Sequence, residues 1–515
     1  MIFFGAYGFI APWGGDIHVY IAAVHSLYRD TWNPSDVSLG VKSGNSVFFG
    51  PYLLLVSLAG KALGVTPYRA LQIAGVFNIA LYACAVTSFC RTFSALPKSP
   101  WPPLLFLAVS LFLRVKIYSW SSETSYQTLG IIQAYPSMVG WSLALFAFVT
   151  AEEVIRTRSA AAIIGLALLI ALSVLTHPIS ATWTIGIVGL RALYFAGTEA
   201  WHAYRQSAPV AAALRPVSIP VLAIIGALVF GVGLSLLWPY YSPLILVRYG
   251  GVQEHDPFSS EPFAGIAATY VLAIAALLLS RNRRIYQFWI LAFLTTFGTF
   301  ELFRFLNIGF VGRYVLFMGF FAQFVVADCA AVAATEFFSG EQGRRAYSER
   351  VKNGIYLALF AIAFVYSPAL HSPLRSGILT LQAWREGKSA ERAYYDRWGP
   401  LRTVIRPGEV IMMPPSWDAG LDIPAVTGAK VVAAAFMVGV PDSNERTRSV
   451  ERFFTPGQTA QARLQELRRW SATKVVLIPP VLDLAEEMQA LLGPPVWRDG
   501  TRVIFTVPPE RLAIE

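Results

Sequence analysis

The sequence predicts a mainly α-helical, polytopic membrane protein with a small α/β domain at its C-terminal end. Of the 515 residues, 55% are hydrophobic and only 14% are charged, a balance outside the range of ordinary water-soluble domains. Apolar runs long enough to cross a bilayer recur throughout residues 1–371. Beyond residue 371 the apolar runs shorten and charged residues become more frequent, which indicates a separate domain over 372–515.

About eleven transmembrane helices are predicted in residues 1–371. The apolar runs are 1–13 and those near 70–91, 101–118, 131–150, 160–176, 178–196, 217–238, 262–280, 285–301, 313–335 and 353–371. A further run, 47–63, contains Gly50-Pro51 and Lys61, and we interpret it as a re-entrant or surface-lying element. With 47–63 outside the count, the basic loops all fall on one side of the membrane, as the positive-inside rule requires.

This charge pattern also assigns the outer, extracytoplasmic face. The basic loops lie near 91–98, 156–158, 191–215, 281–284 and 344–352. Much of the basic excess behind the net charge of +10 lies in these loops, so no nucleic-acid partner is expected. The outer face receives 16–46, 118–130, 176–178, 238–262, 303–313 and, because the number of spans is odd, 372–515. The predicted location is a multi-pass cell (inner) membrane protein.

The C-terminal segment has the pattern of a small α/β domain. Short apolar runs suited to strands alternate with helical patterns. The strand candidates are 410–413, 430–435, 474–478 and 502–507, and the helix candidates are 460–470 and 482–492. A charged, aromatic helical linker is expected over 379–398.

Asp16 is the first candidate for a functional residue, because it places a carboxylate at a membrane surface directly after an apolar stretch. Residues 17–28 have the spacing of an interfacial amphipathic helix, with Val19, Ala23 and Leu27 on one side, and interfacial helices are expected near 17–63. Asp16 could therefore simply cap that helix, an interaction worth about 1 kcal/mol. Further charged groups on the same face favour a site.

Arg313 is the second candidate. It follows Gly309 and Gly312 at the outer mouth of a span, where glycines allow a ligand to approach and an arginine can hold a phosphate with two hydrogen bonds. It could equally be an anchor that reaches the lipid headgroups. Arg114 and Lys116, near the outer end of their span, suit an anionic headgroup.

Other polar residues on the outer face are candidates for substrate binding. They are His18, His177, Arg248, His255 and Glu123. Each histidine could instead be structural, and Glu123 could be a solvated loop residue. No metal or other cofactor is assigned, because Asp-x-Asp, His-Glu-x-x-His and Cys-x-x-Cys motifs and Gly-rich phosphate loops do not occur. A divalent metal therefore has no motif to support it.

The chain resembles the GT-C type of integral-membrane glycosyltransferases. The resemblance rests on Asp16 after the first span, the segment Phe48-Phe49-Gly50-Pro51-Tyr52-Leu53-Leu54, the outer-mouth Gly312-Arg313-Tyr314 and a C-terminal domain on the same side as the acid. It implies a polyprenyl-phosphate-linked sugar as donor, a glycan, lipid or protein as acceptor, and Asp16 as the catalytic base. Displacement in one step would invert the anomeric configuration.

Two other functions remain open on the sequence. One is a lipid or polysaccharide transporter or flippase, and the other is a non-catalytic subunit of an envelope polysaccharide assembly. Against a transporter, the sequence has no repeated halves and few charges within its spans. The expected cell-envelope enzyme would keep its polar site open to the outer face and to membrane lipid.

Overall fold

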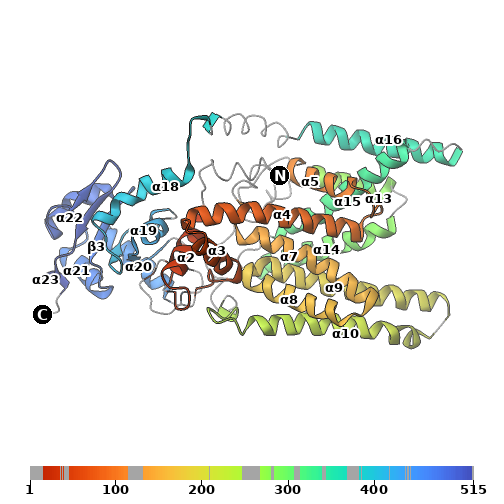
Figure 1. Ribbon diagram of the computed structural model, residues 1–515, viewed down its shortest axis with the longest axis horizontal. Helices are drawn as coiled ribbons and strands as arrows, with labels where there is room; N and C mark the ends of the chain where they lie inside the picture. Colours follow the sequence, from red (N-terminus) through yellow and green to blue (C-terminus); the bar gives the residue numbers. More distant parts are fainter. Residues whose placement is uncertain are drawn as a thin grey trace. The chain divides into compact units, whose positions relative to one another are not determined.

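The computed structural model describes most of the chain (Figure 1). The described residues are 16–34, 36–37, 39, 46–113, 132–207, 209–245, 267–279, 283–306, 314–338, 344–367, 382–383, 385–416, 418–434, 437, 440 and 442–512. They are mainly helical and form two compact units. One contains the described residues within Gly75–Trp238 and Gly251–Glu386, and the other those within Phe9–Ala74, Pro239–Gly250 and Gly387–Glu515.

The first unit is a helical bundle. Its helices are α4 (Pro67–Phe93, from Gly75 onward), α5 (Trp101–Phe112), α7 (Pro136–Thr157), α8 (Ala160–Thr176), α9 (Pro178–Arg205), α10 (Val210–Ser235), α13 (Ala267–Leu279), α14 (Arg283–Phe305), α15 (Tyr314–Phe338) and α16 (Arg344–Val365). Helices α7 to α10 contact one another, while α15 contacts α5, α13, α14 and α16. Each span predicted from residue 70 onward overlaps one of these helices.

Five helices in the described part of the chain are long and apolar enough to cross a membrane. They are Pro67–Phe93, Pro136–Thr157, Pro178–Arg205, Arg215–Ser235 and Phe317–Phe338. Shorter apolar helices, α5, α8 and α13 among them, accompany them. The segment 1–13 lies outside the described residues, so the count of about eleven spans stays a prediction.

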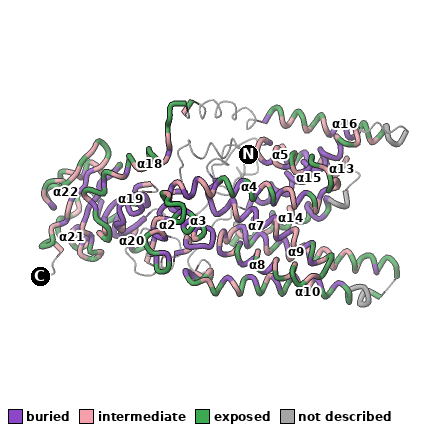
Figure 2. Tube along the Cα trace, in the orientation of Figure 1, coloured by how far each residue is buried: buried purple, intermediate pink, exposed green. Residues whose placement is uncertain are grey.

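Aromatic side chains form the core of the bundle. The Phe89 ring of α4 lies 5.1 Å from that of Trp289 in α14 and 4.9 Å from that of Phe324 in α15. Trp183 of α9 stacks on Phe317 of α15 at 4.7 Å. Helix α15 is buried along most of its length (Figure 2), because its aromatic side chains meet neighbours on several sides.

Gly231 sets the close approach of α10 to α8. A Cβ atom at this position would lie 2.5 Å from the carbonyl oxygen of Ala167 and 2.9 Å from the Cβ of Ile170. We expect Gly231→Ala to lower the thermal midpoint of the protein in detergent, because overpacking costs about 1–3 kcal/mol. The matched control is Gly233→Ala on the same helix, where a Cβ meets nothing within 4 Å. Equal midpoints for the two variants would contradict the expectation.

The second unit combines the first described helices with the C-terminal elements. Its helices are α2 (Ile17–Arg29), α3 (Pro51–Ala62), α18 (Ala390–Trp398), η2 (Gly399–Thr403), α19 (Ala419–Thr427), α20 (Ser443–Phe454), α21 (Ala460–Arg469), η3 (Leu482–Leu484), α22 (Ala485–Leu492) and α23 (Pro509–Leu512). At 12 residues, α3 is about 18 Å long, shorter than the ~30 Å hydrocarbon core, which fits a surface-lying or re-entrant position.

A five-stranded sheet lies within this unit. Its strands are β1 (Val410–Met412), β2 (Lys430–Val431), β3 (Lys474–Leu477), β4 (Trp497–Arg498) and β5 (Val503–Thr506), in the order β2-β1-β3-β5-β4. β1 pairs in parallel with β2 and β3, and β5 pairs antiparallel with β3 and β4. All four residues of β3 are buried, as expected for a central strand.

The first segment of the chain contacts the C-terminal elements directly. Helix α2 packs against α3 and α19, Leu39 forms a parallel bridge with Val431 of β2, and Lys430 donates a hydrogen bond to the carbonyl oxygen of Asp36. Nine of the thirteen α2 residues are consequently buried. The helix predicted at 17–28 is present, but it is covered on more sides than a one-faced interfacial helix. The domain limits 1–371 and 372–515 stay predictions.

Candidate active site

Asp16 lies at the N-terminus of α2, half-buried, in the second unit. Its carbonyl oxygen accepts the first helical hydrogen bond, from Val19 N at 3.1 Å. Its carboxylate makes no capping hydrogen bond to the helix among the described residues. Asp16 thus does not have the capping role that the sequence allowed, and it lies where the partial positive charge of the helix end favours an anion.

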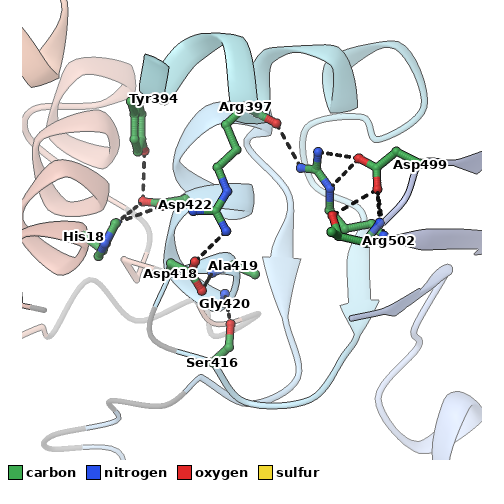
Figure 3. Close-up of polar contacts among 11 residues, drawn as sticks. His18, Tyr394, Arg397, Ser416, Asp418, Ala419, Gly420, Asp422, Asp499 and Arg502 are labelled. Atoms are coloured by element: carbon green, nitrogen blue, oxygen red, sulfur yellow. Dashed lines mark hydrogen bonds and ion pairs between the residues drawn. The ribbon is translucent and has the colours of Figure 1, made fainter. Parts of the chain in front are cut away.

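His18, in the first turn of α2, is joined to a buried acid from the far end of the chain (Figure 3). Its Nδ1 lies 2.9 Å from Oδ1 and 2.8 Å from Oδ2 of Asp422 in α19. The hydroxyl of Tyr394 in α18 donates to the same Oδ1 at 3.0 Å. Burial raises the pKa of Asp422, and the hydrogen bonds from His18 and Tyr394 partly offset that rise.

A second acid, Asp418, lies at the start of α19. Its Oδ1 accepts a hydrogen bond from Ala419 N at 2.8 Å, and its Oδ2 lies 2.8 Å from Nη2 of Arg397. Burial alone would raise the pKa of Asp418, but the Ala419 hydrogen bond and the Arg397 charge outweigh burial, so that the pKa lies below its ordinary value. A positive charge on His18 would act in the same direction.

The other ends of α2 and α19 are also joined, so the two helices run side by side in the same direction. Arg29 donates to the carbonyl oxygen of Ala425 at 3.2 Å, and Arg402 to that of Val426 at 2.9 Å. These cations satisfy carbonyls in the last turn of α19, where positive charge is favourable. Gly428 follows with φ +85°, and a Cβ there would lie 2.8 Å from the Arg29 guanidinium.

His25 lies in α2 near Arg29 and Arg402, at the C-terminal end of the α2–α19 pair, and its ring is held in the neutral form. Burial and then the charges of Arg29 and Arg402 lower its pKa to about 3. Lys430 also has a lowered pKa, about 8, mainly because of burial. The pKa of Arg29 is lowered as well, by burial and then by the charge of Arg402. The basic end of the α2–α19 pair is thus crowded with cations, whereas acids gather at its other end.

His177, predicted as a substrate-binding candidate, lies in the first unit at the start of α9. Its Nδ1 accepts a hydrogen bond from Ser180 N at 3.3 Å and lies 2.6 Å from Ser180 Oγ. Its ring packs beside Gly140, where an added Cβ would lie 2.8 Å from the Cβ of His177. The structure thus gives His177 a capping role, and substrate binding by this residue stays a prediction.

Several predicted site residues lie outside the described part of the chain. They are Arg313, Arg248, His255, Glu123, Arg114 and Lys116. Their roles stay predictions. Within the described residues, no group of three or more His, Cys, Asp or Glu side chains could hold a metal ion.

Sequence reasoning missed Asp418, Asp422 and Tyr394. Asp422 is 404 residues away from His18, and the sequence around it has neither a catalytic motif nor a clear helical pattern. The sequence did offer one signal for Asp422. Its carboxylate lies between the apolar residues Leu421 and Ile423, and burying a carboxylate is costly unless it has a partner.

Comparison with known proteins identifies the fold. No protein-family model matches the chain, and no curated protein matches it in sequence. Solved structures do match, and they show that the chain has the fold of the GT-C membrane glycosyltransferases. The resemblance predicted from the sequence is thereby confirmed at the level of the fold. The five long apolar helices in the described part of the chain agree with a membrane protein of this fold.

The particular structures are two crystal structures of ArnT and one cryo-EM structure of AftD. ArnT from Cupriavidus metallidurans bound to undecaprenyl phosphate is 13% identical, with a TM-score of 0.52 over 100% of this chain and 97% of that chain. Its apo state, also 13% identical, gives 0.54 over the same shares. Mycobacterial arabinofuranosyltransferase AftD is 14% identical, with a TM-score of 0.53 over 93% of this chain and 34% of that chain. At these identities the likeness establishes the fold.

Proposed function

We propose that the protein is a membrane glycosyltransferase that moves a sugar from a polyprenyl-phosphate donor to an extracytoplasmic glycan, lipid or protein acceptor. The observation that carries the proposal is the fold likeness over the whole chain to ArnT in complex with undecaprenyl phosphate. In this proposal the protein lies in the cell (inner) membrane, and its active face and C-terminal elements are extracytoplasmic.

Asp16 is the proposed general base. A sugar hydroxyl is a poor nucleophile, and a half-buried carboxylate within hydrogen-bonding reach can remove its proton as the oxygen attacks the anomeric carbon. The bond between that carbon and the phosphate oxygen breaks in the same step, so the configuration inverts. The half-buried position of Asp16 at a helix start supports this role.

The leaving group is a lipid phosphate, which needs cations more than it needs a proton donor. Arg313 is the first choice for this role, followed by Arg248, Arg114 and Lys116. For the sugar and the acceptor, the proposed binding residues are His18, His177, His255 and Glu123. These assignments follow from the sequence and its predicted topology.

A panel of donors tests the proposed function. The purified full-length protein is incubated with undecaprenyl-phosphate sugars, one at a time, and with a glycan and lipid extract of cell envelopes as the acceptor pool. We expect one donor to be consumed, with release of undecaprenyl phosphate and labelling of one acceptor fraction. Undecaprenyl phosphate without a sugar is the control. Protein-dependent movement of intact donor across liposomes, without its consumption, would favour a flippase instead.

A further inference from the structure

We propose that Asp422 is a positioning residue that fixes the tautomer of His18, so that Nε2 of the ring accepts a hydrogen bond from a hydroxyl of the sugar substrate. This inference rests on the proposed function, in which His18 is a binding residue. It adds an acid from the C-terminal part of the chain that no sequence motif identified.

The geometry leaves one edge of the His18 ring available. Among the described residues, Asp422 is the hydrogen-bonding partner of the imidazole, through Nδ1. The side chain of Asp422 is fully buried, whereas that of His18 keeps 13% of its surface exposed. Because Nδ1 faces the carboxylate, the proton of a neutral ring belongs on Nδ1. The lone pair is then on Nε2, which can accept a hydrogen bond.

The contact is part of a fixed arrangement. The Tyr394 hydroxyl donates to Oδ1 of Asp422 at 3.0 Å and so holds the carboxylate in place. Asp422 also lies one helical turn after Asp418 in α19, whose charge faces His18 as well. Asp16, two residues before His18, starts the same helix. The carboxylate therefore fixes the first turn of the helix that carries the proposed base.

Asp422→Asn gives a specific expected result for the tautomer. The Tyr394 hydroxyl keeps the amide oxygen on its side, so the amide N–H₂ faces Nδ1 of His18. That N–H₂ takes the place of Oδ2, 2.8 Å from Nδ1. We therefore expect Nδ1 to accept a hydrogen bond from it and the ring proton to move to Nε2. Replacing the carboxylate of such a carboxylate–histidine pair with an amide can leave the geometry intact and still give the wrong tautomer.

The tautomer can be read without any enzyme assay. The chain has six histidines, so ¹⁵N-histidine labelling gives few imidazole signals, and His18→Asn or His18→Gln identifies the one from His18. At pH 8 we expect the Nδ1-protonated form in the wild type and the Nε2-protonated form in Asp422→Asn. An Nε2-protonated or doubly protonated ring in the wild type would overturn the proposal, whether or not any donor is turned over.

A double-mutant cycle tests the link to catalysis. In His18→Asn the amide N–H₂ can replace Nδ1 beside Asp422, but no atom replaces Nε2. We expect each single variant to lose on the order of 10²-fold in kcat/KM, and the double variant to lose no more than either one. If Asp422 acted independently of His18, the fold-losses in kcat/KM of the two single variants would multiply in the double variant, because the free-energy changes of independent sites add. That result would overturn the proposal.

A matched control variant completes the experiment. Glu487→Gln makes the same change of carboxylate to amide, at the partner of buried Arg463 in the same unit (Nη1–Oε2 2.7 Å), and should leave kcat/KM near the wild-type value. Failure of the wild type to use any donor would count against the proposed function, while the tautomer measurement would still decide the role of Asp422.

Discussion

Asp16→Asn is expected to abolish sugar transfer while the protein remains folded. The amide has nearly the same shape as the carboxylate but cannot take a proton from the acceptor hydroxyl. A general base typically contributes 10²–10⁴-fold to the rate, so the initial rate with the accepted donor should drop by at least about 10²-fold. Because the amide keeps the size of the side chain and one oxygen that can accept hydrogen bonds, the thermal midpoint should stay near that of the wild type.

The matched control for this variant is Asp30→Asn at the other end of the same helix. Asp30 is exposed, and its Oδ1 accepts hydrogen bonds from Trp32 N at 3.1 Å and Asn33 N at 3.0 Å. The oxygen of an asparagine can accept the same two bonds, so transfer should continue. If Asp16→Asn keeps a wild-type rate under saturating donor, Asp16 is not the base.

The helices and strands could largely be predicted from the sequence, because local patterns determine them. Runs of apolar residues predicted a helix at each span from residue 70 onward, and the strand candidates at 410–413 and 474–478 contain β1 and β3. Helix α19 was not predicted. Its residues Ala419–Thr427 include Gly420 and Pro424 and are all buried, so no polar face marks the helical period.

Only part of the candidate site could be predicted from the sequence. Asp16 could be identified from local sequence, because a carboxylate directly after an apolar stretch is costly whatever the rest of the fold is. The partner of His18 could not, because a contact over 404 residues depends on how α19 packs against α2. The same packing explains why α2 differs from the predicted interfacial helix: Ile17, Tyr20 and Ile21 are buried in addition to Val19 and Ala23.

The second large effect is expected from pH, through His25. In the folded protein its pKa is about 3, compared with an ordinary 6.5. Between these values the unfolded chain binds a proton that the folded chain does not, so the free energy of unfolding decreases as pH falls below about 6.5. The His25 contribution is fully present above pH 6.5. It decreases by at most about 1.4 kcal/mol per pH unit below it, which amounts to several kcal/mol by pH 4.

The measurement is the thermal midpoint of purified protein in detergent between pH 7.5 and 4. Because the raised pKa of Asp422 acts in the opposite direction at low pH, the difference between wild type and variant isolates the histidine. We expect the thermal midpoint of His25→Gln to decrease less than that of the wild type as the pH is lowered. His202→Gln, which makes the same change at an exposed histidine in the last turn of α9, should leave the decline unchanged. Equal declines in wild type and His25→Gln would mean that His25 is protonated in the folded protein as readily as in the unfolded chain. The basic end of the α2–α19 pair would then not hold its ring neutral.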